Sequence, residues 1–410
     1  MQSQMVGDVK WAKNKFHSIE YNEEELSIFA KSQIQSVHAF QQTHRAYTRT
    51  PLYQLGYLAE HLQVADIRVK DESYRFGLNA FKVMGGIYAV GKYVAQQLGE
   101  KVEDLSFEAL QSPRVKEKLG EITFISATDG NHGRGIAWAA RELGQRSVIY
   151  MPKGSSIQRL MAIRSEGAQA DITEVNYDET VRMCAALAEK NGWVLVQDTA
   201  WEGYDDIPLW IMQGYASMAK EIEEQLLEDG AKPPTHVFLQ AGVGSFAAAI
   251  AGYLVYVYRD NPPVILVVEP DQADCYYRSF TTEDGGREVV GGEMKTIMAG
   301  LACGEPNTRA FRLLRQYARG AFSCPDAISA LGMRVYGNPL KSDPRVISGE
   351  SGAVTLGLLY YLRKLSDDPQ LCRELSLDTS SRILVISTEG DTDPQQYQTI
   401  VWEGQYPAYK

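Results

Sequence analysis

The stretch ITFISATDGNHGRGIAWAARELGQRSVIYM, residues 122–151, decides the fold. It begins with the apolar run ITFIS (122–126), continues through a glycine-rich turn and a helical pattern over 133–143, and ends in a second apolar run, SVIYM (147–151). A strand, a helix and a strand in this order form a βαβ unit, which builds a parallel sheet with helices on its faces. The stretch therefore predicts an α/β fold.

Further runs of strand length extend this pattern along the chain. Two of them, ADITEV (170–175) and WVLVQ (193–197), complete the first group, and HVFLQ (236–240), PVILVVEP (263–270) and RILVIST (382–388) form a second. The segments between them predict helices over 157–165, 178–190, 207–227, 246–258 and 354–365. The two groups predict two doubly wound α/β domains with mainly parallel sheets and a cleft between them. We expect the smaller domain at 89–204, inserted in a larger one formed by 1–88 and 205–410.

The composition narrows the possible functions. The 410 residues include 41 Lys plus Arg and 52 Asp plus Glu, a formal net charge of −11, which disfavours a nucleic-acid partner. The five cysteines lack a CxxC spacing and the histidines lack metal-ligand spacing, so we expect no metal site. No secretory signal is visible, and the apolar stretch 237–258 is broken by glycines, which predicts a strand, a turn and a helix instead of a membrane span. Together these features predict a cytoplasmic protein.

The candidate site residues follow the predicted strands, because ligands of open α/β sheets bind where the strands end. The segment after IRVKDE (67–72) carries Lys82 at the start of an apolar helix. Burial disfavours the charged form of a lysine, so we expect a lowered pKa for Lys82, as a lysine that forms a Schiff base requires. The alternative is an ordinary lysine whose stem packs while its ammonium reaches water.

Two further loops offer backbone donors to an anion. ATDGNHGRG (127–135) places glycines around Asn131 and His132 at a helix N-terminus, and AGVGSF (241–246) adds two glycines and Ser245 after a strand. The N–H groups and the helix dipole at such positions favour a phosphate, although glycine-rich turns also serve tight packing. A dinucleotide site does not fit, because GVGSFA lacks the third glycine of the G-x-G-x-x-G fingerprint.

Taken together, these segments resemble the fold-type II pyridoxal-phosphate enzymes, which include the serine and threonine dehydratases and the tryptophan synthase β subunit. The resemblance is carried, in chain order, by RTPL (49–52), Lys82, Asn131, GVGS (242–245), VEP (268–270) and Ser387-Thr388. It implies a homodimer and a pyridoxal 5′-phosphate held covalently by Lys82 in the cleft between the domains. The further cofactor contacts that it implies are Asn131 at the 3′-oxygen, Gly242, Val243, Gly244 and Ser245 at the phosphate, and Thr388 or Ser387 at the ring nitrogen.

Departures from the dehydratase pattern indicate a narrower family. AFKVMG (80–85) lacks the Ser and the Arg of the usual dehydratase motif, and Asp129 replaces the usual small residue before Gly-Asn-His. With QDTAWEGY (197–204), AGLACGEPN (299–307) and ISGESGAV (347–354), these segments resemble the diaminopropionate ammonia-lyases. The resemblance implies α,β-elimination of 2,3-diaminopropionate to pyruvate and two ammonia.

Two aspartates complete the set of catalytic candidates. The second ammonium of the substrate needs carboxylates that a hydroxyl-eliminating dehydratase does not, and Asp129 and Asp198 are placed to supply them. If Asp129 faces the substrate opposite Lys82, the enzyme accepts the D as well as the L isomer. The alternatives are a helix N-cap for Asp129 and a turn or cap residue for Asp198. For the whole protein, the alternatives are a serine or threonine dehydratase and a catalytically silent pyridoxal-phosphate-binding protein.

Overall fold

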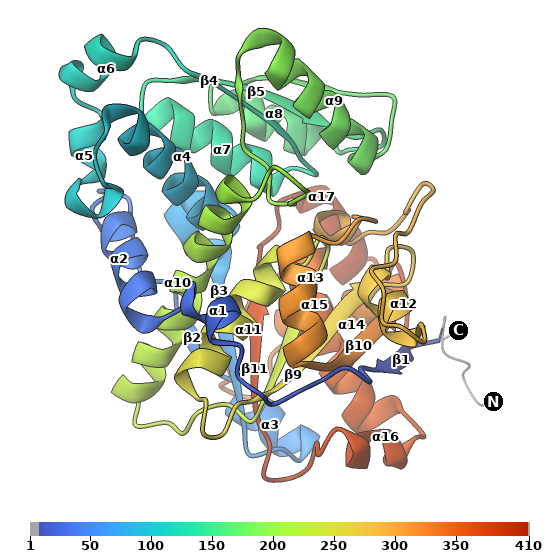
Figure 1. The fold of residues 1–410 in the computed structure, drawn as a ribbon. Helices are drawn as coiled ribbons and strands as arrows, with labels where there is room; N and C mark the ends of the chain where they lie inside the picture. The colour runs from blue at the N-terminus through green and yellow to red at the C-terminus, as the bar shows by residue number, and fades with distance from the viewer. Residues whose placement is uncertain (1–7, 409–410) are drawn as a thin grey trace.

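A computed structural model describes residues 8–408 of the chain as two sheets with helices packed around them (Figure 1). The larger sheet has seven strands in the spatial order β1 (Lys10–Lys13), β10 (Ala318–Cys324), β9 (Val264–Pro270), β8 (His236–Gln240), β11 (Arg382–Ser387), β3 (Asp66–Asp71) and β2 (Leu52–Gln54). The central strands are parallel, and β1 and β2 add antiparallel edges.

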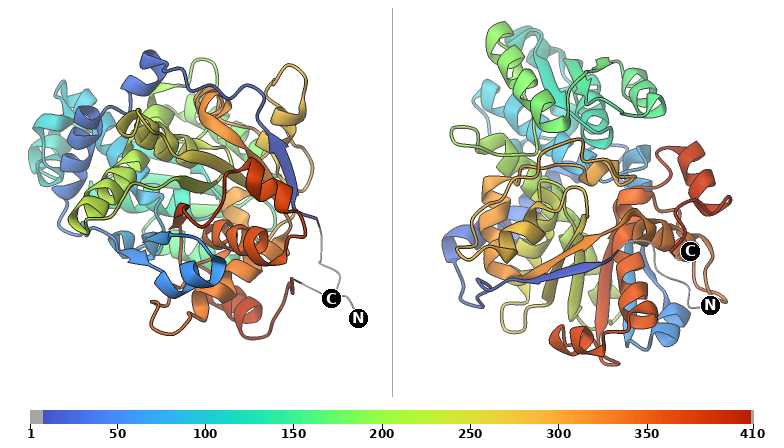
Figure 2. Two further views of the ribbon diagram at one scale, coloured as in Figure 1. Left: turned by 90° about the horizontal axis from the view of Figure 1, so that it is seen from below. Right: turned by 90° about the vertical axis from the view of Figure 1, so that its right-hand side faces the viewer.

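The smaller sheet has four parallel strands in the order β6 (Gln169–Ile172), β5 (Arg146–Met151), β4 (Thr123–Ala127) and β7 (Val194–Leu195). Along the chain these strands alternate with α7 (Asn131–Glu142), α8 (Ile157–Ser165) and α9 (Tyr177–Asn191). Figure 1 shows this cyan-to-green segment above the larger sheet, and the right-hand view of Figure 2 shows the same separation. Two mainly parallel α/β sheets confirm the predicted fold class.

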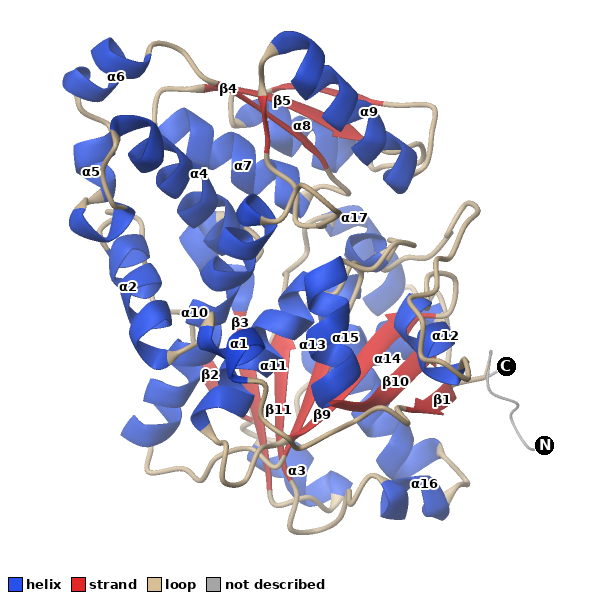
Figure 3. Cartoon of the chain, viewed as in Figure 1, coloured by secondary structure: helices blue, strands red, loops and turns tan. Residues whose placement is uncertain are grey.

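The remaining helices, blue in Figure 3 like the others, lie before and after this segment in the sequence. The N-terminal ones are α1 (Glu23–Ser27), α2 (Lys31–Gln42), α3 (Gly56–Leu62), α4 (Val83–Leu98), α5 (Phe107–Leu110) and α6 (Pro113–Leu119). The C-terminal ones are α10 (Asp206–Glu228), α11 (Ser245–Val257), α12 (Cys275–Thr281), α13 (Thr308–Tyr317), α14 (Asp326–Gly337), α15 (Glu350–Tyr360), α16 (Pro369–Glu374) and α17 (Pro394–Val401). Shorter turns are η1 (Glu72–Gly77), η2 (Val102–Asp104), η3 (Ala299–Leu301) and η4 (Tyr361–Leu365). Since α4 crosses the expected domain limit at 88/89 as one helix, the limits 89 and 204 stay a prediction.

The apolar stretch 237–258 forms β8, a glycine-rich turn and α11, as predicted. Within residues 8–408, no helix is long and apolar enough to cross a membrane. Three strands, β1, β2 and β10, were not predicted from the sequence. The reason is clearest for β10, whose residues ARGAFSC lack the β-branched side chains typical of strands and which is specified by its place between β9 and β1.

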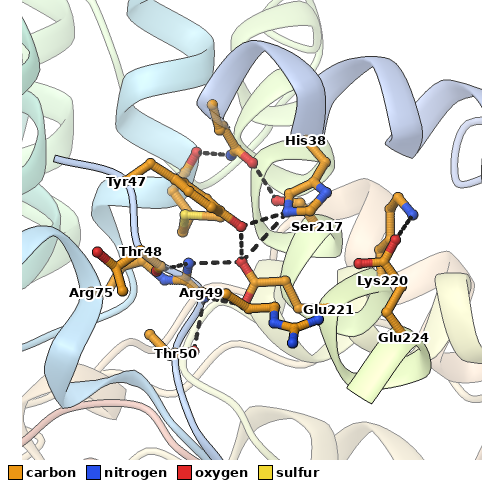
Figure 4. Close-up of polar contacts among 12 residues, drawn as sticks. His38, Tyr47, Thr48, Arg49, Thr50, Arg75, Ser217, Lys220, Glu221 and Glu224 are labelled. Atoms are coloured by element: carbon orange, nitrogen blue, oxygen red, sulfur yellow. Dashed lines mark hydrogen bonds and ion pairs between the residues drawn. The ribbon is translucent and has the colours of Figure 1, made fainter. Parts of the chain in front are cut away.

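A group of four buried charges joins β3 and η1 to α10. Lys70, Glu72, Arg75 and Glu221 are all fully shielded from solvent, and we call them the paired ionic cluster. The Glu221 carboxylate lies 2.6 Å from the Lys70 ammonium and 2.8 Å from the Arg75 guanidinium, which also lies 2.8 Å from the Glu72 carboxylate. Figure 4 shows Tyr47 donating a hydrogen bond to the same Glu221 carboxylate. Two cations and two carboxylates therefore balance inside the protein, as buried charges require.

Candidate active site

Both sheets direct the carboxyl ends of their strands toward one pocket, where ligands of open α/β sheets bind. The segments after β8 and β11 line it from the larger sheet, and those after β4 and β7 line it from the smaller one. Most residues predicted for the site line this pocket, namely Lys82, Asn131, Asp198, Gly242, Val243, Gly244, Ser245 and Thr388. Asp129 joins them through its contact with Lys82.

Glycines in the neighbouring helices set the position of Lys82. Lys82 directly precedes α4, which packs against both α7 and α10. A Cβ at Gly135 of α7 would lie 2.9 Å from the Cα of Val83, and a Cβ at Gly214 of α10 would collide with the carbonyl oxygen of Met84. Any larger residue at these two positions would push α4 away, so the glycines allow Lys82 to approach the smaller sheet closely.

The Lys82 ammonium lies between two carboxylates. Its Nζ is 3.5 Å from Oδ1 of Asp129 and 3.4 Å from Oδ2 of Asp198, and we call these three residues the Lys82 cluster. Burial alone lowers the pKa of Lys82, but the two carboxylates outweigh burial and hold that pKa well above its usual value. The predicted lowering of the Lys82 pKa is therefore wrong for the chain without cofactor. The alternative of a lysine that reaches water is also wrong, because its side chain is only 12% exposed.

The two aspartates differ in their hydrogen bonds. Oδ1 of Asp198 accepts from the hydroxyl of Tyr177 at 3.4 Å, and although burial works to raise the pKa of Asp198, the Lys82 charge holds it below its usual value. Oδ2 of Asp129 is buried and has no hydrogen-bond partner within residues 8–408. The alternative of Asp129 as a helix cap is wrong, since Gly130 occupies the N-cap position of α7. Asp129 therefore keeps an oxygen that can accept a proton or bind a cation.

The turn between β8 and α11 forms a cradle for an anion. A Cβ at Gly242 would lie 3.2 Å from the Cα of Leu301, and a Cβ at Gly244 would collide with the ring of Tyr276. Positions 242 and 244 therefore have room for backbone only, at the N-terminus of a helix whose dipole favours a negative charge. The hydroxyl of Ser245 donates to a backbone carbonyl inside the protein, so Ser245 has its N–H rather than its hydroxyl proton to offer to an anion.

The end of β11 settles which of two neighbouring hydroxyls faces the pocket. Oγ1 of Thr388 lines the pocket and accepts a hydrogen bond from Nε2 of Gln240 at 3.0 Å, which leaves the Thr388 hydroxyl proton free for a ligand. Ser387 is fully buried, and its hydroxyl donates to the carbonyl of Glu389 at 3.4 Å. Of the two candidates left open by the sequence, Thr388 is the one that lines the pocket.

Several lining residues were not predicted. Glu389, Ser351 and Tyr215 line the pocket, and only Glu389 carried a signal, as the acidic residue directly after Thr388 at the end of a predicted strand. Cys303 also lines the pocket, and the five cysteines of the described chain are all free. The neighbouring His132 is buried, with Nε2 2.9 Å from the carbonyl oxygen of Val196, and burial lowers its pKa.

Comparison with known proteins gives the family. The model of the pyridoxal-phosphate-dependent enzymes matches residues 44–376. The diaminopropionate ammonia-lyase of Salmonella typhimurium is 51% identical over 369 residues, which cover 90% of this chain and 91% of that protein. This chain belongs to the diaminopropionate ammonia-lyase family of pyridoxal-phosphate-dependent enzymes. The predicted family, cofactor and class of enzyme, a pyridoxal-phosphate-dependent ammonia-lyase, are confirmed.

Solved structures of the same family have this fold. The crystal structure of holo diaminopropionate ammonia lyase from Escherichia coli has a TM-score of 0.91 to this chain at 48% identity, and the match covers 99% of this chain and 100% of that one. The Escherichia coli enzyme in complex with D-serine matches with a TM-score of 0.90 at 47% identity, covering 98% of this chain and 99% of that one.

The pocket fits the cofactor that the family name implies. A lysine amine lies in it, as covalent attachment to an aldehyde requires. The Gly242 to Ser245 turn has no room for a Cβ at positions 242 and 244 and lies at a helix N-terminus, which suits a phosphate. The Asn131 amide and the Thr388 hydroxyl line the same pocket and offer polar contacts to a heteroaromatic ring.

Proposed function

We propose that this protein converts 2,3-diaminopropionate and one water molecule to pyruvate and two ammonia, starting from either the L or the D isomer. The Lys82 cluster is the observation that carries this proposal, because it places two buried carboxylates beside one ammonium at the pocket. A substrate with an ammonium on Cβ can pair with the second carboxylate, whereas the hydroxyl of serine or threonine cannot make such a charged pair. The relative from Salmonella typhimurium is a diaminopropionate ammonia-lyase, which supports the same substrate.

The residues of the pocket hold the cofactor at four points. Lys82 would hold it covalently, the N–H groups of 242–245 would hold its phosphate, and Asn131 and Thr388, which line the same pocket, would contact its 3′-oxygen and its ring nitrogen. When bound, pyridoxal phosphate supplies a conjugated ring that delocalises the electron pair of a broken Cα–H bond. Thr388 would meet the ring nitrogen with a neutral hydroxyl, which adds no charge that would keep that nitrogen protonated.

Lys82 and Asp129 move the Cα proton. For the L isomer, Nζ of Lys82, freed when the substrate amine takes its place, would accept this proton, and for the D isomer the unpartnered Oδ2 of Asp129 would accept it from the opposite face. The Cα–H electron pair forms the Cα–Cβ double bond, and the Cβ–N bond breaks with its electrons on the nitrogen, which leaves as ammonia. Water then releases the second ammonia and leaves pyruvate.

The second ammonium of the substrate also favours the neutral form of Lys82, which is the form that accepts the Cα proton. In the chain without cofactor, Asp129 and Asp198 hold the pKa of the free Lys82 amine well above its usual value, so this amine carries a proton and is a poor base. A substrate ammonium bound at the Asp198 carboxylate competes with Lys82 for that charge. This competition favours the neutral form of the Lys82 amine. Serine cannot compete in this way, because it has no ammonium on Cβ.

The test is an assay of the purified holoenzyme with L-diaminopropionate, D-diaminopropionate and L-serine in parallel. We expect two ammonia for each pyruvate from both diaminopropionate isomers and much slower release from serine. Faster turnover of serine or threonine would identify a dehydratase instead. A yellow protein that releases no ammonia from any of these amino acids would identify a silent cofactor-binding protein.

The homodimer remains a proposal that rests on the family resemblance, and the cytoplasmic location remains one that rests on the sequence features described above. Light scattering of the holoenzyme after size-exclusion chromatography is expected to give twice the mass of one chain. The mass of a single chain would contradict the dimer.

A further inference from the structure

Glu389 connects several parts of the site, and the proposed reaction does not use it. It follows Thr388 at the end of β11, lines the pocket and is 1% exposed. Its Oε2 accepts from the Nδ2 group of Asn131 at 2.5 Å and from the hydroxyl of Thr392 at 3.3 Å, and its Oε1 accepts from the backbone N–H of Ser351 at 3.1 Å. A buried carboxylate with donors on both oxygens has one fixed orientation.

The backbone around Glu389 is bound to the loop that carries Lys82. Ala80 and Glu389 form an antiparallel bridge, and the N–H of Phe81 donates to the carbonyl of Thr388 at 3.0 Å. Asn131 begins α7 of the smaller sheet, so its bond to Glu389 also connects the two sheets. The Glu389 carboxylate therefore has a defined position relative to both Lys82 and Asn131.

The Glu389 carboxylate fixes the orientation of the Asn131 amide. Oε2 of Glu389 accepts from the NH₂ group of Asn131, so this group and not the amide oxygen faces the carboxylate. One N–H of that group is used by Glu389, and the direction of the other N–H follows from the planar geometry of the amide. Without the carboxylate, the amide could turn over and present its oxygen where it now presents a donor.

We propose that Glu389 is a positioning residue that orients the Asn131 amide, so that its second N–H donates to the 3′-oxygen of the cofactor. The inference rests on the cofactor contact proposed above for Asn131. It assigns to Glu389 an indirect effect on the electronic state of the bound cofactor, since a donor at this oxygen stabilises its anionic form.

The variant Glu389→Gln tests this role, because its amide can donate to the Asn131 oxygen and permits the turned-over orientation. We expect the dissociation constant of pyridoxal phosphate from the cofactor-free chain to rise roughly ten- to a hundredfold. We also expect the pH-dependent change in the absorbance of the bound cofactor to move to higher pH, which a purely structural role would not produce. Asp391→Asn is the matched control, since Asp391 accepts from the Nδ2 group of Asn79 at 3.1 Å in the same loop, and we expect it to leave both values unchanged.

Binding of inorganic phosphate to the cofactor-free variant checks that the pocket is intact. We expect Glu389→Gln to bind phosphate as the wild type does, because Glu389 has no contact with the Gly242 to Ser245 turn among the hydrogen bonds of residues 8–408. A parallel loss of phosphate binding would show that Glu389 supports the whole pocket and would overturn the specific role.

Asn131→Ala separates this inference from the proposal on which it rests. If Asn131→Ala binds pyridoxal phosphate as tightly as the wild type, the proposed Asn131 contact fails. If Asn131→Ala weakens binding while Glu389→Gln changes neither the dissociation constant nor the absorbance profile, the positioning role fails and the Asn131 contact stands. We expect the double variant to bind no more weakly than Asn131→Ala alone, whereas additive losses would contradict an action of Glu389 through Asn131.

Discussion

In the paired ionic cluster, the Glu221 carboxylate lies 2.6 Å from the Lys70 ammonium and 2.8 Å from the Arg75 guanidinium. In the Lys82 cluster, by contrast, the ammonium lies 3.5 Å from the Asp129 carboxylate and 3.4 Å from the Asp198 carboxylate. The first cluster has as many cations as carboxylates. The second has one carboxylate in excess, and Asp129 keeps an oxygen without a hydrogen-bond partner in the part of the chain that the structure describes. Both are buried, so the difference lies in the pairing of their charges.

This difference separates a stabilising cluster from a reactive one. Burial works to raise the pKa of Glu221, but Arg75 and Lys70 hold it well below its usual value, so Glu221 stays ionised and has no capacity for a further cation. The Lys82 cluster can accept a second ammonium, because its carboxylates outnumber its cation. Buried charges that are incompletely paired beside a pocket are typical of functional sites.

Removing the cation of the Lys82 cluster has the largest expected effect. For Lys82→Ala we expect kcat/KM for diaminopropionate to fall by at least about 10³-fold and the purified protein to lack the cofactor absorbance, because both the covalent attachment and the base are lost. Lys92→Ala on the same helix, whose ammonium lies 5.4 Å from the centre of the Tyr88 ring, serves as the control and should keep the absorbance. A yellow and active Lys82→Ala would refute the assignment.

Removing a carboxylate from the paired cluster should mainly reduce stability. Glu221→Gln leaves Lys70 and Arg75 buried with Glu72 as their one remaining carboxylate, so we expect the free energy of unfolding to fall by about 3–5 kcal/mol. Urea unfolding followed by circular dichroism measures it. Asp129→Asn makes the same chemical change in the Lys82 cluster but leaves one cation facing one carboxylate, so its loss should be clearly smaller than that of Glu221→Gln. Equal losses in the two variants would show that the clusters do not differ in the way described.

Asp129→Asn should instead change the choice of isomer. An amide cannot accept the Cα proton, so we expect turnover of D-diaminopropionate to fall by about 10²-fold or more, while turnover of the L isomer is partly kept because Lys82 remains. Steady-state kinetics on both isomers give the ratio. If both isomers lose the same factor, Asp129 binds or supports the substrate without acting as a base.

The smallest expected effect is the pH dependence of the stability that the paired ionic cluster contributes. Since the folded-state pKa of Glu221 lies well below its usual value of 4.5, its contribution to stability is fully present above that value and is lost as the pH falls through the folded-state pKa. The difference in the free energy of unfolding between the wild type and Glu221→Gln should therefore be constant between about pH 6 and 8. Below about pH 4.5 this difference should shrink by up to about 1.4 kcal/mol per pH unit. An advantage that stays constant down to acid unfolding would contradict a lowered Glu221 pKa.

Much of the fold could be predicted from local patterns. HVFLQ forms β8 over the predicted residues, and the helix predicted at 157–165 is α8, because continuous apolar runs and amphipathic periods specify these elements without help from the rest of the chain. β10 could not be predicted, since its residues become a strand through pairing with β9 and β1, and that pairing is a property of the whole sheet.

The residues of the site could be predicted from the sequence, but the pKa shift of Lys82 could not. Lys82, Asn131 and the 242–245 turn follow predicted strands, and all of them line the pocket. The expected direction of the Lys82 pKa shift was wrong because burial can be predicted from an apolar helix, whereas the approach of Asp129 and Asp198 depends on how the smaller sheet packs. The paired ionic cluster gave no signal, because Glu221 lies 151 residues from Lys70 in the sequence and joins Lys70, Glu72 and Arg75 only in the folded chain.

The attachment of the cofactor to Lys82 is tested most directly by reducing the holoenzyme with borohydride and mapping the modified peptide by mass spectrometry. Reduction makes the bond between lysine and cofactor permanent, so the account predicts a pyridoxyl phosphate group on the peptide that contains Lys82 and on no other. A modification at a different lysine, or none on a holoenzyme that was yellow before reduction, would contradict the account.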